Sequence, residues 1–144
     1  ALSIGSASFF NAKLVEKVGM KKLTLSALLV LSFLALLFLI TSILLGAATS
    51  LTAFLIYMLL SFFCIGILFG NFNALAISPL GHIAGIGAAI NGFVSTVLAV
   101  PIANYIGGFV DDTVWPMFLG LAICGLISLL IFVAFGKKPL LGRI

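Results

Sequence analysis

Residues 23–110 read LTLSALLVLSFLALLFLITSILLGAATSLTAFLIYMLLSFFCIGILFGNFNALAISPLGHIAGIGAAINGFVSTVLAVPIANYIGGFV, a run of 88 residues without Asp, Glu, Lys or Arg. A bilayer core about 30 Å thick takes roughly 20 apolar residues for each helical crossing. The run is therefore long enough for three crossings joined by short turns. This stretch predicts a membrane protein built of helices.

The composition of the whole chain supports the same class. Hydrophobic residues make up 64% of it and charged residues only 7%, against roughly 25% charged in soluble domains. The seven basic residues are confined to 13–22 and 137–143, where they flank apolar segments. This placement is typical of membrane orientation, so we expect no nucleic-acid partner.

We expect an all-α, polytopic membrane bundle with four full spans, over residues 24–46, 51–77, 83–107 and 114–135. Residues 1–10 look like the end of a fifth helix, which indicates a fragment that begins inside a span. Residues 11–23 are expected to form a basic loop and residues 136–144 a tail. Four crossings return the chain to its starting side, so all seven basic residues share one face. The positive-inside rule makes that face cytoplasmic, with the carboxy terminus, and leaves Ser50, Asp111 and Asp112 outside.

Small residues distinguish the two middle spans from the outer two. Gly66 and Gly70 have the spacing that lets helix backbones approach closely. The third span has a stripe of small residues at helical spacing, which predicts a buried, closely packed helix. The residues of this stripe that we expect to matter for packing, with the proline that should bend the helix, are Gly81, Gly85, Ala88, Gly92 and Pro101.

Polar side chains inside the spans are the candidate functional residues, because such groups are costly in lipid and tend to face the bundle or a cavity. For the asparagines, two interpretations stay open: contact with a substrate or gate, and hydrogen bonds between helices. Ser95 and Thr96 are candidate cavity contacts, although bonding back to their own helix is the alternative. The asparagines concerned are Asn71, Asn73, Asn91 and Asn104.

The stretch 71–96 carries a resemblance to a known family. Its phrases NALA (73–76) and PLGHIAG (79–85) resemble the junction of the tenth and eleventh helices in drug-efflux proteins of the major facilitator superfamily, in the branch named for bicyclomycin and chloramphenicol resistance. Val100, Pro101 and the segment 112–116 are also similar to this branch. The branch often has an acidic residue where this chain has Ser78.

The basic segment before the first full span is similar to a weakened copy of the superfamily's loop signature. In that signature an acidic and a basic residue precede a glycine and further basic residues. The matching residues are Glu16, Lys17, Gly19 and Lys21, while Ala12 and Met20 depart from the pattern.

The resemblance covers nearly the whole chain, as the end of helix eight to helix twelve of a twelve-helix transporter. It implies a proton-coupled antiporter of the bacterial inner membrane that exports small drug-like compounds. The implied partners are the lipid bilayer, the missing amino-terminal half, the substrate and protons. The coupling carboxylate is implied to lie in the missing half, so we expect the fragment not to transport alone.

A different class stays open beside the transporter: a self-contained, small four-helix membrane protein that acts as a subunit or assembly partner. We expect no enzyme, metal or cofactor, because the spans offer neither a metal-ligand cluster nor a nucleophile beside a base. The sequence upstream of Ala1 distinguishes the two classes. About seven further spans in frame indicate the transporter, and an immediate start codon indicates the subunit.

Overall fold

The computed structural model describes residues 2–45, 50–109 and 114–136, and all regular structure in these ranges is helical. The elements are α1 (Leu2–Val18), α2 (Met20–Leu45), α3 (Leu51–Ile77), a 3₁₀ segment η2 (Ser78–Ile83), α4 (Ala84–Gly107) and α5 (Trp115–Gly136). The spans expected at 51–77, 83–107 and 114–135 agree with α3, α4 and α5 to within one residue at each end. Asp111, Asp112 and the tail from residue 137 lie outside the described residues.

Within the described ranges, three helical stretches are long and apolar enough to cross a membrane: Met20–Leu44, Leu51–Gly107 and Trp115–Phe135. The second is 57 residues long and contains α3, η2 and α4. At a rise of about 1.5 Å per residue, this is more than one crossing needs. By the length and apolarity of these helices, the chain is an all-helical membrane protein.

Residues 11–23, expected to be a loop, are helical on both sides of a single break. α1 continues to Val18 and α2 begins at Met20, so the first helix is longer than the ten-residue remnant that we expected. Gly19 between them has a φ of +85°, a conformation that costs glycine no side-chain clash. Its N–H donates to the Val15 carbonyl at 3.0 Å, and its carbonyl accepts from the Leu23 N–H at 3.1 Å. The backbone therefore turns a corner at Gly19 while the hydrogen-bonding pattern continues.

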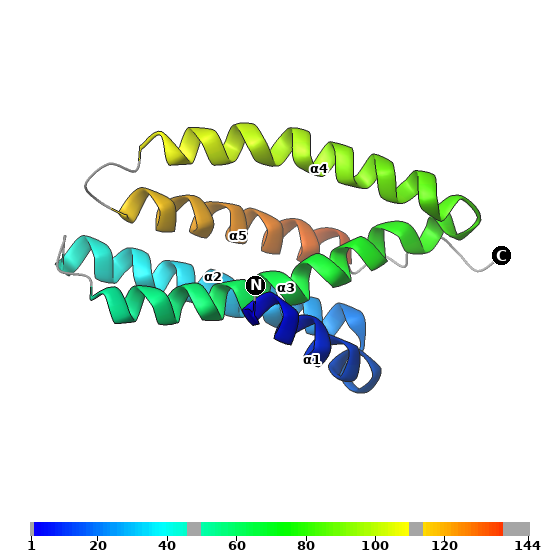
Figure 1. Cartoon of the computed structure of the whole chain (residues 1–144), viewed down its shortest axis with the longest axis horizontal. Helices are drawn as coiled ribbons and strands as arrows, with labels where there is room; N and C mark the ends of the chain where they lie inside the picture. The colour runs from blue at the N-terminus through cyan, green and yellow to red at the C-terminus, as the bar shows by residue number, and fades with distance from the viewer. Residues whose placement is uncertain (1, 46–49, 110–113, 137–144) are drawn as a thin grey trace.

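α2 lies at the centre of the bundle and packs against both α3 and α5, while α1 lies along α3 (Figure 1). Successive long helices alternate in direction. The α1–α2 junction, η2 and the end of α5 lie toward one end of the molecule, and the starts of α3 and α5 lie toward the other (Figure 1). Successive crossings of a membrane require such alternation, and the number of crossings stays a prediction.

The core has an aliphatic part and an aromatic part. The aliphatic part joins α1, α2 and α3 and contains Ala7, Leu23, Ala27, Leu28, Leu31, Cys64, Ile67 and Leu68. The aromatic part joins α2, α3 and α5 through Phe38, Phe54, Tyr57 and Phe118. Of the two cysteines, Cys64 is buried and Cys124 is exposed.

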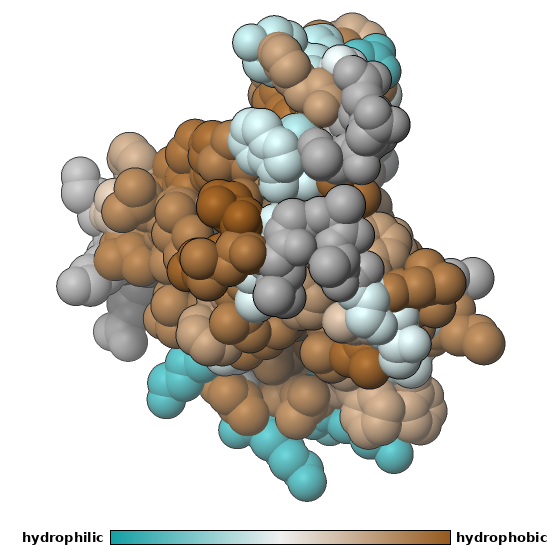
Figure 2. Space-filling model, turned by 90° about the vertical axis from the view of Figure 1, so that its left-hand side faces the viewer, coloured by the Kyte–Doolittle hydropathy of each residue, from teal (hydrophilic) through white to brown (hydrophobic). Residues whose placement is uncertain are grey.

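α4 is the least covered helix, and the expectation that it is buried is wrong for this chain. Gly87 is its only buried residue, and most of its other residues are exposed. α4 runs along the edge of the bundle (Figure 1). Figure 2 views the molecule along its helices, from the end at which α3 and α5 begin, and most of the described residues in this view are apolar.

Candidate functional site

The polar side chains of α3 lie on two different faces of that helix. Asn71 and Asn73 are two residues apart, a rotation of about 200° around the helix axis, so their side chains point to nearly opposite sides of α3. Asn71 faces α1 and Asn73 faces α4, as their hydrogen bonds show. Side-chain amides of α3 are therefore hydrogen-bonded to α1 on one side and to α4 on the other.

Asn71 forms a reciprocal amide pair with Asn11 of α1. Asn11 Nδ2 donates to Asn71 Oδ1 at 3.2 Å, and Asn71 Nδ2 donates to Asn11 Oδ1 at 3.0 Å. Asn71 is only 1% exposed. Each amide therefore donates one hydrogen bond and accepts one within the pair, which reduces the cost of placing these polar groups between helices.

Asn73 links α4 to α3 through a second set of hydrogen bonds. Asn91 Nδ2 donates to Asn73 Oδ1 at 2.7 Å, and Asn73 Nδ2 donates to the Phe69 carbonyl of its own helix at 2.9 Å. These contacts are the interhelical bonding that the sequence left open beside a substrate or gate role. The substrate or gate role of Asn71, Asn73 and Asn91 stays a prediction.

The other candidates on α4 are not brought together with these amides. Ser95, Thr96 and Asn104 are exposed. The Thr96 hydroxyl donates to the Gly92 carbonyl one turn earlier at 2.9 Å, which is the back-bonding alternative. Their role as cavity contacts stays a prediction.

The small-residue stripe faces no other helix of the described chain. Gly81, Gly85, Ala88, Gly92 and Pro101 are exposed, and a Cβ on any of the three glycines would meet nothing within 4 Å. That these residues pack against another helix therefore stays a prediction, and it requires a partner other than the described helices.

A glycine outside the stripe makes the close contact between α4 and its connection to α3. A Cβ on Gly87 would lie 2.8 Å from Leu80 Cδ1. Leu80 itself has non-helical backbone angles, with φ −105° and ψ 25°. The side chain of Leu80 thus fills the inside of the bend between the two helices.

The residues matching the loop signature lie around the α1–α2 junction. Glu16 and Lys17 are exposed in the last turn of α1, Gly19 is the break, and Lys21 is exposed in the first turn of α2. Lys13, one turn before Lys17, lies with its Nζ 4.7 Å from the centre of the Phe9 ring. The junction is a compact helical corner with exposed charges.

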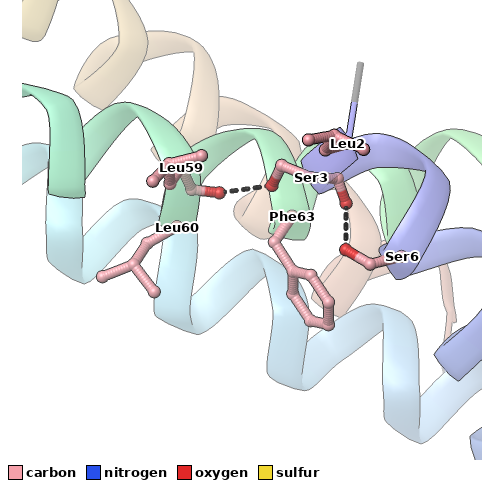
Figure 3. Close-up of a pocket in the computed structure, with 6 residues that line it drawn as sticks. All are labelled: Leu2, Ser3, Ser6, Leu59, Leu60 and Phe63. Atoms are coloured by element: carbon pink, nitrogen blue, oxygen red, sulfur yellow. Dashed lines mark hydrogen bonds between the residues drawn. The ribbon is translucent and has the colours of Figure 1, made fainter.

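An open groove of about 510 Å³ runs between α1 and α3 and is lined by Leu2, Ser3, Ser6, Leu59, Leu60 and Phe63 (Figure 3). Its two hydroxyls are both engaged: Ser3 donates to the Leu59 carbonyl at 2.6 Å and Ser6 to the Ser3 carbonyl at 2.8 Å. The groove therefore offers a mainly apolar surface.

Asn11 is the polar residue of this region that the sequence analysis missed. It falls in the segment interpreted as a loop, although a helix through residue 18 places it on one side with Ser3 and Ala7. That four-residue spacing was the available signal.

The chain matches no family model, no curated protein and no solved structure. Its class therefore rests on the described helices, which define a helical membrane protein.

Proposed function

We propose that this chain is part of the carboxy-terminal half of a proton-coupled efflux transporter of the major facilitator superfamily. In this proposal α2, α3, α4 and α5 are four separate spans of the bacterial inner membrane and α1 belongs to the preceding span. The cargo is a small, partly apolar compound exported in exchange for protons.

The exposed surface of α4 is the observation that carries the proposal. Ser95, Thr96 and Asn104 lie on a helix whose small residues at Gly85 and Gly92 also meet open space. In a membrane, small residues favour close helix contact and intramembrane polar groups favour a protein partner or a cavity over lipid. The side of α4 that carries Gly85, Gly92 and Thr96 is suited to face a second half of a transporter across a central cavity, with Ser95 and Asn104 on either side of it.

The distribution of charge supports the proposed orientation. Lys13, Lys17, Lys21 and Lys22 lie in the last turns of α1 and the first turn of α2, toward the same end of the bundle as η2 (Figure 1). The positive-inside rule makes this end cytoplasmic.

Proton coupling is assigned to the amino-terminal half of the proposed transporter. The sequence contains three acidic residues, Glu16, Asp111 and Asp112, and all three lie outside the apolar interiors of the predicted spans. A coupling carboxylate has to bind and release protons at membrane depth, and alternating access needs two halves around a central site.

A resistance assay in a drug-sensitive, efflux-deficient bacterium tests the proposal. The 144-residue chain alone should insert in the membrane and leave resistance unchanged, whereas the continuous reading frame with its upstream half should confer resistance. Within the longer protein, Ser95→Leu and Thr96→Leu should lower resistance at unchanged protein level. The matched control is Leu36→Ala on α2, which lies outside the proposed cavity.

Two results would count against the proposal. Resistance from the 144-residue chain alone, abolished by collapsing the proton gradient, would contradict the need for a second half. A start codon immediately before Ala1, with no further spans in frame, would favour the self-contained four-helix subunit.

A further inference from the structure

Two small residues, Ser3 and Ala7, lie in the contact between α1 and α3, beside the ring contact of Phe10 with Phe63. Ser3 and Ala7 are four residues apart and lie on one side of α1. Ser3 donates to the Leu59 carbonyl of α3, and Ala7 lies against Gly66. Because the residue numbers of the contacts rise together on both helices, α1 and α3 run parallel.

The apolar part of this interface offers Ala7 two positions, one helical turn apart. In the observed position Ala7 packs against Gly66, and a Cβ on this glycine would lie 2.7 Å from Ala7 Cβ. Gly70 provides a second small position four residues later, and a Cβ there would meet only Asn11 Nδ2, at 3.6 Å. A slide of α1 by one turn toward the end of α3 would place Ala7 against Gly70. Contact between small residues alone therefore specifies the alignment of the two helices weakly.

The amide pair next to these glycines has only one matching position. Asn11 and Asn71 exchange two hydrogen bonds in the observed alignment. After a slide of one turn, Asn11 would lie opposite Leu75 and Asn71 opposite Ala7. Both amides would then lose their partner, which is costly above all for Asn71, because that side chain is buried.

We propose that the Asn11–Asn71 pair is a register lock, which selects one position of α1 along α3. A buried asparagine can fix the alignment of packed helices while adding little to their stability. A slide of α1 would have to be taken up at its junction with α2, by unwinding of helical residues on both sides of Gly19, where the helix is already broken. This inference is independent of the proposed transport function.

Spin labels that report the position of α1 along α3 test the lock. In a background with Cys64→Ala and Cys124→Ala, Ser6→Cys on α1 and Ser78→Cys at the end of α3 take one label each. Pulsed electron paramagnetic resonance on the 144-residue chain in nanodiscs then gives the distance between them. With the amide pair intact we expect a single distance.

Removing both amides should release the register without unfolding the protein. In the variant with Asn11→Leu and Asn71→Leu we expect a second population, shorter by roughly 6 Å, the rise of four helical residues. Its helical circular dichroism and melting temperature should stay close to those of the parent, since replacing both partners by apolar groups leaves no unpaired donor. Asn71→Leu alone leaves the Asn11 amide without its partner and should lower the melting temperature more than the double change.

The control is Asn104→Leu, which changes an exposed asparagine of α4 and should leave a single distance. A single, unchanged distance in the double variant would show that the pair does not set the register. Loss of the helical fold in the double variant would also overturn the proposal, because the pair would then act through stability.

Discussion

The rings of Tyr57 and Phe118 meet edge to face, with their centroids 5.0 Å apart and their planes at 86°. Both side chains are fully buried, and Phe38 of α2 packs against both of them. Edge-to-face pairs add to the stabilisation that comes from burying the rings. This contact joins α3 to α5 at the aromatic part of the core.

Phe118→Ala should therefore be among the most destabilising single changes in the chain. Truncating a buried phenylalanine typically costs about 3–5 kcal/mol, and we expect a marked fall in melting temperature in detergent. Tyr57→Phe keeps the ring and should lose far less. Phe93→Ala is the control, because Phe93 is 71% exposed on α4; an equal loss at Phe93 would argue against the aromatic core.

Gly66→Leu should separate α1 from α3. A Cβ at this position would lie 2.7 Å from Ala7 Cβ and 3.3 Å from backbone atoms of Ile4, and backbone atoms cannot move aside as a flexible side chain can. Overpacking of this kind costs roughly 1–3 kcal/mol, which thermal unfolding of the purified chain would measure.

Gly92→Leu is the matched control for this change, since the same substitution on α4 meets open space. In the 144-residue chain it should leave the melting temperature unchanged. A loss of stability equal to that of Gly66→Leu would show that α4 is packed in a way the described helices do not account for.

Asn91→Leu should weaken the attachment of α4 to α3. It removes the donor that Asn73 Oδ1 accepts at 2.7 Å, and hydrogen bonds between membrane helices contribute about 1 kcal/mol. Hydrogen exchange of the α4 backbone should increase near residue 91. Asn104→Leu does not remove this hydrogen bond and should leave the exchange unchanged. Equal effects from both variants would contradict the role of Asn91 in holding α4 against α3.

Reporter fusions test the orientation of the helices. Fusions at Lys17 and after Lys138 should report the cytoplasm, and fusions at Ser50 and Asp112 should report the outside, because the basic residues lie on one side of the four predicted crossings. A fusion at Asp112 that reports the cytoplasm would rule out four crossings.

The positions of the long helices could be predicted because apolar length is a strong signal. α3 begins at Leu51 and ends at Ile77 as expected, since Ser78 and Pro79 interrupt the helix. The end of α1 was predicted wrongly, because its lysines make residues 11–18 resemble a loop in composition. These residues are the last turns of a helix. Only the backbone shows that a single residue, Gly19, separates α1 from α2.

The partners of each helix were harder to predict than its bounds. The small residues of α4 indicated a packed surface, but their spacing does not say which helix covers it, and in this chain Gly85 and Gly92 are exposed. Asn71 was identified as a costly polar group, but its partner Asn11 lies 60 residues away in sequence. Contacts between distant segments depend on how helices are arranged around one another, which periodicity within one helix does not encode.

The shortness of η2 has a consequence for how the protein enters the membrane during synthesis. Six residues connect α3 to α4, so the two helices form one hairpin, and Asn91 is only 18 residues behind Asn73. An amide that enters hydrocarbon alone is costly, whereas two amides bonded to each other present fewer unsatisfied groups. In the proposed four-span arrangement, the hairpin can therefore carry both asparagines into the bilayer as a pair, before any later helix has been made.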